Sequence, residues 1–556
     1  MPPDTSTLTK PAKDTNELLE RFSVESRDHA IAALLKRDAR TLPDIRPDVA
    51  EQVRALRPPF KRFHGLKVPI FWFPWWLWRT RCSDKFGYLT PAAVRTATKL
   101  PVDAATATAL QQLGGFMATD PGPANPADSV IPAGYTYFGQ FVDHDITLDI
   151  SDLDFSVEHD ATKINNMRSP SLDLDSVYGR GPALDPFLYV FPSSGPPTAI
   201  KMLLGANQPP PAPEAPNGGP GSGNGFGPMG IPTNSDLPRA STQTALIGDP
   251  RNDENLIVSQ FHHAMLKFHN QIVDGLVAQG FGGDVFLEAK RTVTHHYQWA
   301  VVNDYLKRIC GAAAVSAALG SVIAAKGSPF LMPVEFSVAA YRFGHSMVRQ
   351  SYWVNQTQIG APLSKVFDFS RNPRLPVFSN WVVDFNAFFD TGLNAAVHNK
   401  ARPIDSLLSP GLDQLPGLSG LLAKLATRNL LRGLALGLPS GQGVAGHFGI
   451  APLTAAQLKQ GISANQAALL DANGGQLLNK TPLWYYVLRE AMVLNSGNQL
   501  GPVGGRIVAE TFVRMLKRDA DSFLNTPSAF TPTLPSAVAG DFTVADLVNV
   551  ARVTVP

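Results

Sequence analysis

The chain has 556 residues, 48 lysines and arginines against 46 aspartates and glutamates, and only two cysteines. A near-neutral charge without a long block of basic residues excludes the electrostatic footprint of a nucleic-acid-binding protein, so we expect small-molecule partners. Two cysteines exclude a disulfide framework and a thiolate cluster, and they permit at most one bridge. Two unpaired thiols at Cys82 and Cys310 are the preferred interpretation.

The N-terminal residues 1–22 contain no basic start followed by an apolar core, which excludes a conventional signal peptide. We therefore expect a cytoplasmic protein or secretion by a signal-independent route. The aromatic run VPIFWFPWWLW at 68–78 is too short to cross a bilayer. Packing of these aromatics into a core is the preferred interpretation, and peripheral membrane contact is the alternative. We expect an N-terminal extension at 1–80, one domain at 81–556, and a Pro/Gly-rich surface loop at 206–235.

The segment GYTYFGQFVDHDITLD, residues 134–149, places an amide, two carboxylates and an imidazole in an otherwise apolar, aromatic run. If 138–147 is helical, Gln140 and His144 lie four apart on one face, while Asp143 and Asp145 point about 100° to either side of the histidine. The pattern indicates a functional site. In the competing interpretation, the acids only complement the helix dipole and the histidine is a core residue.

A second polar segment, SPSLDLDSVYGRG at 169–181, carries side-chain oxygens at every second position from 169 to 175. An extended loop would place these alternate residues on one side, where they could converge on a calcium ion at about 2.4 Å. A solvated acidic turn is the alternative. The oxygen-bearing residues are Ser169, Ser171, Asp173 and Asp175.

A long buried helix is expected from Arg251 to Val277, because Asp249 and Pro250 mark a start and apolar residues recur at helical spacing. Arg251 and Glu254 should share one face at its entrance.

Histidines are frequent in and after this helix, but no carboxylate accompanies them at metal-ligand spacing. We interpret them as core or hydrogen-bonding residues. They are His262, His263, His269, His295 and His296.

The segment SVAAYRFGHSMVRQ at 337–350 is also expected to be helical. It would place Arg342 and His345 three apart, and Gly344 would leave room for a flat molecule to approach closely.

The segment LLAKLATRNLLRGLALGLP at 421–439 predicts a further helix that ends near Gly437 and Pro439. It would place Asn429 and Arg432 on one face.

Taken together and in this order, the five segments resemble the animal-type haem peroxidases of the peroxidase–cyclooxygenase superfamily, especially peroxinectin-like bacterial members. The resemblance covers roughly residues 80–530. It implies a mainly α fold, with a single large haem-peroxidase domain and few short β-strands. It also implies an enzyme that reduces hydrogen peroxide through an oxoferryl intermediate and oxidises small organic donors, halide or pseudohalide.

The resemblance assigns roles to the residues named above. His144, Arg251 and Gln140 are the implied catalytic residues on the distal side of the haem. His345 is the implied ligand of the haem iron, supported by Asn429. The implied partners of the haem propionates are Arg342 and Arg432, and the implied calcium ligands are Asp145, Ser169, Ser171, Asp173 and Asp175.

The family also implies that the haem, derived from haem b, is covalently attached through ester bonds from Asp143 and Glu254. The residue after Glu254 is Asn255. The most oxidising members of the family have at this position a methionine that forms a sulfonium link, so a third bond and extreme halide-oxidising power are not expected.

Two alternatives remain open. A fatty-acid dioxygenase of the same superfamily would need a tyrosine three residues before His345, but that position is Arg342 and the nearest tyrosine is Tyr341. The other alternative is a haem-binding adhesion protein with a vestigial site; it ranks lower, because all the distal residues are present.

Overall fold

A computed structural model describes residues 62–63, 66–67 and 84–553, with gaps at 121–127, 152, 209–233, 328–329, 370–374 and 394–396. The chain divides into two compact units, Met1–Thr80 and Arg81–Pro556. In the first unit, β1 (Arg62–Phe63) pairs antiparallel with β2 (Leu66–Lys67). The predictions made for 1–22, for the aromatic run 68–78 and for most of the 206–235 loop concern residues outside those described.

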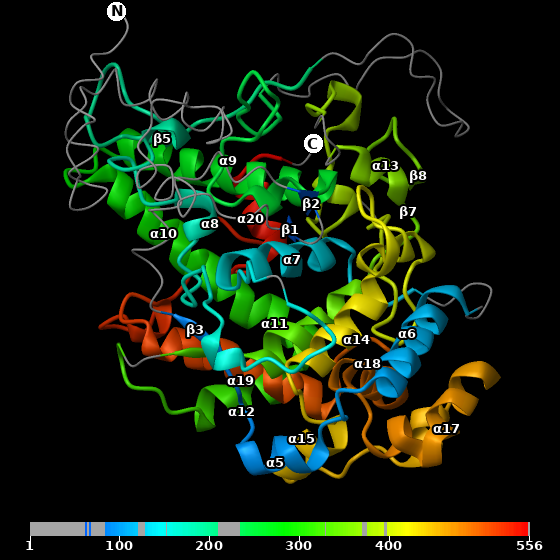
Figure 1. Ribbon diagram of the computed structural model, residues 1–556. Helices are drawn as coiled ribbons and strands as arrows, with labels where there is room; N and C mark the ends of the chain where they lie inside the picture. Colours follow the sequence, from blue (N-terminus) through cyan, green and yellow to red (C-terminus); the bar gives the residue numbers. More distant parts are fainter. Residues whose placement is uncertain are drawn as a thin grey trace, which may run out of the picture. The chain divides into compact units, whose positions relative to one another are not determined.

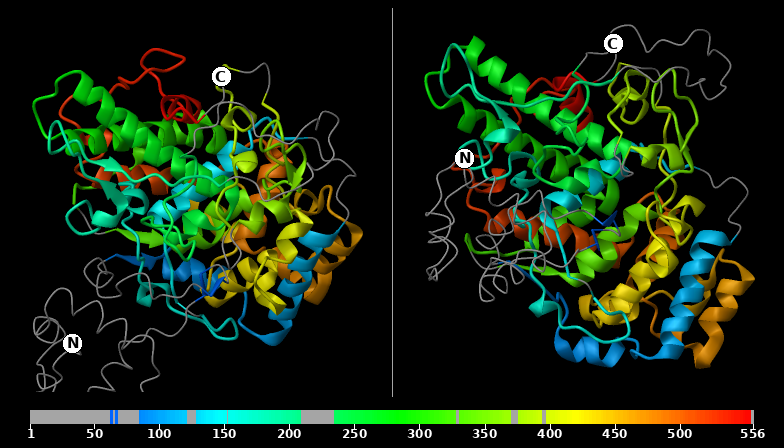
Figure 2. Two further views of the ribbon diagram at one scale, coloured as in Figure 1. Left: turned by 90° about the horizontal axis from the view of Figure 1, so that it is seen from above. Right: turned by 45° about the horizontal axis from the view of Figure 1, so that its top comes forward.

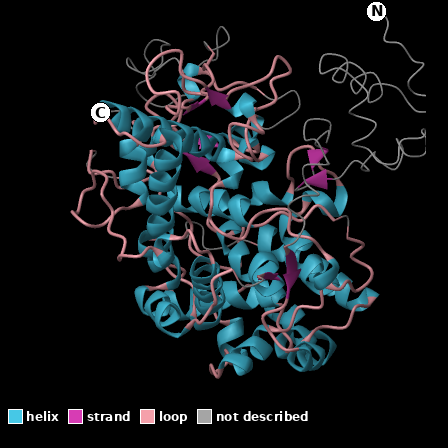
Figure 3. Ribbon diagram, turned by 90° about the vertical axis from the view of Figure 1, so that its left-hand side faces the viewer, coloured by secondary structure: helices cyan, strands magenta, loops and turns pink. Residues whose placement is uncertain are grey.

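The second unit is built mainly from α-helices joined by long connections (Figures 1 and 3), which confirms the expected mainly α fold. Irregular 3₁₀ and π turns lie between several of the helices. The α-helices are α5 (Ala92–Thr98), α6 (Ala104–Thr119), α7 (Gly134–Ile146), α8 (Asp175–Tyr178), α9 (Leu256–Ala278), α10 (Val285–Ala300), α11 (Leu306–Cys310), α12 (Ala312–Ser321), α13 (Leu363–Asp368), α14 (Leu425–Ala435), α15 (Gly441–Phe448), α16 (Ala455–Lys459), α17 (Ala464–Asn479), α18 (Leu483–Asn495), α19 (Pro502–Arg518) and α20 (Val544–Val550).

The described strands of this unit are two or three residues long and form two-stranded sheets, as expected. They are too short to form a layer, and only the β3–β6 pair among them joins segments that are distant in sequence. The pairs are β3 (Lys85–Gly87) parallel to β6 (Leu331–Pro333), β4 (Tyr189–Val190) antiparallel to β5 (Lys201–Met202), and β7 (Ser351–Tyr352) antiparallel to β8 (Ala361–Pro362).

Helix α7 runs through the middle of the second unit (Figure 1). Its aromatic residues are buried and are packed from several sides. The Phe138 ring lies edge-on to the rings of Phe261 on α9, Tyr297 on α10 and Tyr305, with centroid distances of 5.5, 6.1 and 5.3 Å. Edge-to-face packing of this kind adds to the free energy of apolar burial. The helix that carries His144 is therefore held rigidly.

Helices α9 and α10 lie side by side across one face of this centre (Figures 1 and 2). Helix α6 packs against α14 and α17, which follow it by more than 300 residues. The core therefore joins distant parts of one continuous domain. Among the described residues, no helix combines the length and apolar composition needed to cross a bilayer.

Helix α14 is shorter than the sequence predicts. It begins at Leu425, after a separate 3₁₀ turn over Gly420–Ala423, and it ends at Ala435, close to Gly437 as predicted. The chain reverses at Gly437, which has a φ of 59°, and the backbone N–H groups of Gly437 and Leu438 donate back to the carbonyl groups of Leu434 and Gly433. A glycine in this left-handed region is a common helix stop.

Candidate active site

Helix α7 buries all of its residues except Gln140 and Asp143, which are only partly buried. Three positions apart, these two side chains lie on the same side of the helix. An otherwise buried helix therefore has one side, at Gln140 and Asp143, that the rest of the fold covers only in part. The nearby His144 is 1 % exposed and Asp145 is fully buried.

The structure brings three of the predicted site residues, Gln140, Arg251 and Glu254, together around His144. We call these four residues and Asn252 the distal group. Nε2 of His144 lies 3.5 Å from Oε1 of Glu254, and the side-chain amide of Gln140 donates to the same oxygen. Nη2 of Arg251 donates to the backbone carbonyl of His144 at 2.8 Å. Nδ1 of His144 lies 2.8 Å from Oδ1 of Asn252, a residue that the sequence analysis did not single out.

Arg251 does not begin a long α-helix, which corrects the sequence prediction. It lies in a 3₁₀ turn over Pro250–Asp253, and α9 starts only at Leu256. The chain is capped twice, because the Asp249 carboxylate accepts from the backbone N–H of Arg251 and the Asn255 side chain accepts from that of Val258. Each is an N-terminal cap that starts its own element, Asp249 the 3₁₀ turn and Asn255 helix α9.

The guanidinium of Arg251 is fixed by Asp249, whose Oδ2 lies 2.7 Å from Nη2. Burial alone would raise the pKa of Asp249, but the charges of Arg168 and Arg251 hold it well below its usual range. Arg168 also pairs with Asp175 at 3.0 Å. An ionic chain, Asp175–Arg168–Asp249–Arg251, therefore leads to the backbone of His144.

A second group of residues surrounds His345, and we call it the proximal group. Nδ1 of His345 lies 2.9 Å from Nδ2 of Asn429, and Nη1 of Arg342 donates to Oδ1 of Asn429 at 2.9 Å. The ring of Trp484 lies edge-on to that of His345, with centroids 6.3 Å apart. A Cβ added at Gly344 would meet no heavy atom within 4 Å, so there is open space beside the histidine, as the sequence predicts.

The segment that carries His345 is not the regular helix predicted for 337–350. It is a π turn over Glu335–Ala339 followed by a 3₁₀ helix over Ala340–His345. Side chains take backbone acceptors of this segment, because Arg342 Nε donates to the Ser337 carbonyl and Trp484 Nε1 donates to the Arg342 carbonyl. Tertiary contacts override the helical pattern here, and the i, i+3 relation of Arg342 and His345 is preserved because a 3₁₀ helix has three residues per turn.

Three arginines and three carboxylates lie near the two groups. Burial and the charge of Arg432 lower the pKa of Arg342 to about 10, and the same two causes lower that of Arg428 to about 10. The negative charges opposing these shifts are Asp143 and Asp149 at Arg342, and Glu254 at Arg428; Arg432 pairs with Asp149. Arg428 and Asp149 were not among the predicted site residues, although each lies within one of the predicted segments.

The predicted cation site is a cluster of three carboxylates. Asp145, Asp173 and Asp175 each place an oxygen within 4.8 Å of the other two. Burial, followed by the charges of Asp175 and Asp173, raises the pKa of Asp145 well above its usual range. Buried carboxylates this close repel one another unless a cation or a proton compensates them.

The loop at 169–175, which carries Asp173 and Asp175, is not extended, which corrects the geometry predicted for it. Leu172 and Leu174 have φ values of 51° and 58°, in the left-handed region, and both side chains are fully buried. Asp175 already begins α8, and its Oδ2 accepts from the backbone N–H of Ser169 at 3.3 Å. The alternation of oxygen-bearing residues therefore results from two leucines turned into the core.

The remaining histidines behave as predicted, each having a hydrogen-bonding partner in the fold. Nδ1 of His262 contacts Asn252, His263 contacts the Asn234 carbonyl, and His269 contacts Tyr178 and the Ile200 carbonyl. His295 and His296 contact the carbonyl groups of Asp521 and Thr292. Cys310 is a buried free thiol.

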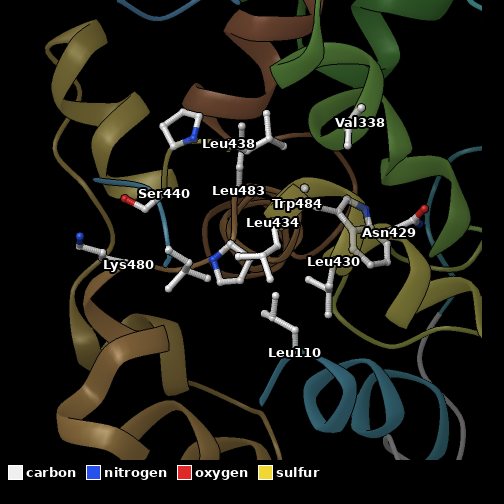
Figure 4. Close-up of a pocket in the computed structure, with 14 residues that line it drawn as sticks. Leu110, Val338, Asn429, Leu430, Leu434, Leu438, Ser440, Lys480, Leu483 and Trp484 are labelled. Carbon is white, nitrogen blue, oxygen red and sulfur yellow. The ribbon is translucent and has the colours of Figure 1, made fainter. Parts of the chain in front are cut away.

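A pocket lies next to the proximal group (Figure 4). Asn429 and Trp484 line it at one side, and Lys480 lies at the other. The lining between them is mostly leucine, including Leu110, Leu430 and Leu434. Apolar surroundings strengthen the electrostatic part of a hydrogen bond, so the pocket favours the one between Asn429 and His345.

The two histidine-centred groups thus lie on α7 and on the 3₁₀ helix Ala340–His345, which contact each other. The animal haem peroxidase family model matches residues 156–549. This range is well over half of the chain, so the protein belongs to the animal haem peroxidase family, and the family implies a haem cofactor. The match begins after α7.

A curated relative is Dual oxidase of Drosophila melanogaster, 24% identical over 298 residues, or 50% of this chain. The chain spans only 18% of that protein's length. Peroxidase A from Dictyostelium discoideum is similar in structure, with a TM-score of 0.51 and 17% identity over 76% of this chain and 84% of that one. Oryza sativa fatty acid alpha-dioxygenase has a TM-score of 0.52 and 13% identity over 92% and 91% of the two chains. At these identities, the structural likenesses establish the fold alone.

Proposed function

We propose that this protein is a haem-dependent peroxidase that reduces hydrogen peroxide and oxidises small organic donors, halide or pseudohalide. One observation carries the proposal: His144 is held by Asn252 at Nδ1 and by Arg251 at its backbone, while its Nε2 lies on the side of Gln140 and Glu254. An imidazole that is fixed at one nitrogen can exchange a proton through the other, which suits general acid–base catalysis.

The residues present fit a haem. Gln140 and Asp143 are only partly buried on an otherwise buried helix, open space lies beside Gly344, and partly buried arginines suit propionate groups. His345 would bind the iron, with Asn429 supporting it, and Arg342 and Arg432 would hold the propionates. When bound, the haem supplies an iron centre that accepts peroxide and gives up two electrons as the oxygen–oxygen bond breaks.

In the proposed reaction, His144 takes a proton from one oxygen of hydrogen peroxide at Nε2 and returns it to the other oxygen, which leaves as water. Arg251 stabilises the negative charge that develops on the departing oxygen. Its guanidinium is permanently charged and already oriented by Asp249, so little reorganisation accompanies the reaction. Gln140 donates to Glu254 and so helps to position that carboxylate beside Nε2 of His144.

We propose calcium for the three-carboxylate cluster, with Ser169 and Ser171 completing the ligand set. Calcium takes six to eight oxygen ligands, and carboxylates are its usual partners in proteins. Neutralising Asp145, the residue after His144, would fix the C-terminal end of α7. The role of the metal is then structural, through the orientation of the histidine.

We also propose ester bonds from Asp143 and Glu254 to haem methyl groups. Each ester exchanges a methyl carbon–hydrogen bond for a carbon–oxygen bond, and the two electrons released reduce one hydrogen peroxide to two waters, with one proton taken up. Oδ1 of Asp143 accepts from the Thr147 hydroxyl at 2.9 Å, which orients it. After peroxide treatment, acidified organic solvent should fail to extract the haem, and mass spectrometry should find haem on both peptides. Complete extraction would remove this part of the proposal.

The dioxygenase alternative is less well supported. Position 342, three before His345, is the partly buried arginine that contacts Asn429. The neighbouring Tyr341 directs its hydroxyl group to the Gly139 carbonyl at 3.3 Å and is 7 % exposed. That hydroxyl is therefore engaged with the backbone of α7.

The function is tested on the purified holoprotein. Its absorption spectrum should change on addition of stoichiometric peroxide and return when a phenol or iodide is added, with oxidised donor formed in proportion to peroxide consumed. A spectrum insensitive to peroxide would indicate a haem-binding protein with a vestigial site. Peroxide-independent oxygen uptake with a fatty acid would favour a dioxygenase.

A further inference from the structure

A buried chain of three side chains begins at His144 and leads away from the open side of the distal group. Nδ1 of His144 lies 2.8 Å from Oδ1 of Asn252, and Nδ2 of Asn252 lies 3.0 Å from Nδ1 of His262 on α9. His144 is 1 % exposed, and Asn252 and His262 are 0 % exposed. The chain is therefore shielded from bulk water.

The chemistry of an amide gives this chain a direction. The Oδ1 atom of Asn252 can only accept, so Nδ1 of His144 carries a proton; Nδ2 can only donate, so Nδ1 of His262 does not. Burial lowers the pKa of His262 to about 3, so the ring is neutral near neutral pH, and its contact with the Asn252 NH₂ group then leaves its one proton on Nε2. In neutral His144, the ring's basic lone pair then lies on Nε2.

We propose that His262 is a positioning residue for the proposed peroxidase reaction: by accepting from Asn252, it fixes the side-chain amide so that His144 keeps its proton on Nδ1 and offers Nε2 as the base. This inference rests on the proposed function of His144. It concerns a residue that touches neither peroxide nor haem and acts only through Asn252.

The opposing influence comes from Glu254. Its Oε1 lies 3.5 Å from Nε2 of His144 and attracts a proton to that nitrogen. If the amide of Asn252 turned around, its NH₂ group would face His144, and the ring would carry its proton on Nε2, beside Glu254. The imidazole could then not take a proton from peroxide. His262 therefore favours one of two hydrogen-bonding arrangements.

The chain offers a closely matched control in His263, the next residue of α9. His263 is 2 % exposed, burial lowers its pKa to about 3 as well, and it contacts the Asn234 carbonyl instead of Asn252. His263→Leu therefore reproduces the loss of a buried imidazole from the same helix without touching the chain to His144. His262→Gln is a conservative variant, since a Gln oxygen can still accept from Asn252.

The first measurement reads the tautomer directly. Long-range ¹H–¹⁵N spectra of the ferrous, carbon monoxide-bound holoprotein, labelled at histidine, should show His144 protonated at Nδ1, with the signal assigned by its loss in His144→Ala. His262→Leu should shift His144 towards the Nε2-protonated form, whereas His262→Gln and His263→Leu should leave it unchanged. A parent protein with its proton on Nε2, or an unchanged tautomer in His262→Leu, would overturn the proposal.

The second measurement is the rate of the spectral change with peroxide. His262→Leu should slow it by about 10- to 100-fold, the usual range for residues that orient a functional ligand or base, while His262→Gln and His263→Leu retain the parent rate. If His262→Leu does not fold, a slowed His262→Gln with the parent tautomer contradicts the proposal. If His144→Ala keeps the parent rate, the proposed function fails, but the tautomer result still stands.

Discussion

On the distal side Asn252 offers its oxygen to Nδ1 of His144, whereas on the proximal side Asn429 offers its amide nitrogen to Nδ1 of His345. The same pair of residue types therefore has opposite polarity in the two groups. A third residue sets each one: His262 accepts from the distal amide, and Arg342 donates to the proximal amide. In each group, the residue that contacts the asparagine orients its amide, and the amide in turn favours one tautomer of the histidine.

The difference has a consequence for metal binding. A histidine that binds iron through Nε2 carries its proton on Nδ1 and needs an acceptor there. Asn429 can supply its oxygen only if its amide turns and Arg342 moves its donor to another acceptor. A haem propionate is such an acceptor. If Arg342 donated to a propionate instead of to Asn429, the Asn429 amide would be released to turn towards His345.

The largest difference between the two groups should appear in haem retention. His345→Ala is expected to abolish stable haem binding, because the iron loses its protein ligand. Haem content per protein after gel filtration measures this. His447→Ala, which removes an exposed histidine from α15, is the control. Full haem occupancy in His345→Ala would show that the proximal group has been misidentified.

The next largest effect separates acid–base chemistry from haem binding. His144→Ala should retain haem but react with peroxide about 10²- to 10⁴-fold more slowly, the typical loss for a general acid–base residue. Stopped-flow absorption with stoichiometric peroxide measures the rate. A variant that reacts at the parent rate would contradict the distal assignment.

Matched asparagine substitutions test whether polarity matters differently on the two sides. Asn429→Asp places a carboxylate beside His345 and should make the haem reduction potential more negative by about 60 mV or more, which is a tenfold change in a one-electron equilibrium. Asn252→Asp, beside His144, should leave the potential nearly unchanged. Spectroelectrochemical titration measures both, and equal shifts would contradict the comparison.

The smallest effect is expected from the cation cluster, which lies on the distal side only. Chelation, or Asp173→Ala, should lower the thermal midpoint by about 3–8 °C and disturb the haem spectrum. The exposed Asp160→Ala serves as the control. Elemental analysis that finds no calcium in active protein would exclude this metal.

The metal-depleted protein should also show a pH dependence with a definite sign. The pKa of Asp145 is raised in the folded state, so the native protein binds a proton that the unfolded chain releases at lower pH. Its stability should therefore fall as pH rises from about 4 through the raised pKa. Calcium should remove this dependence, and thermal scans with and without chelator measure it.

The sequence predicted which residues form the two groups better than it predicted the backbone that carries them. The periodicity of α7 was sufficient because its apolar residues meet aromatic partners on several sides. The segment before His345 was predicted as a regular helix, but Trp484 and the side chain of Arg342 occupy its carbonyl groups. Such long-range partners leave no local pattern.

The supporting residues were the hardest to predict. Arg168 is a single arginine before a polar loop, and only folding brings it to Asp249 and Asp175. Asn252 stands beside a residue that the sequence did single out, but an asparagine in a turn has no distinctive pattern. His262 was placed in the core, correctly; its contact with Asn252 depends on the break between the 3₁₀ turn and α9.

The ionic chain from Asp175 through Arg168 and Asp249 to Arg251 makes the cation cluster and the distal group thermodynamically linked. If a small anion bound near Arg251 changes how firmly that chain is held, it changes the affinity of the cluster for its cation. By reciprocity, the cation must change the affinity for the anion by the same factor. Occupancy of the cluster would then set the anion concentration at which the distal group is half-saturated.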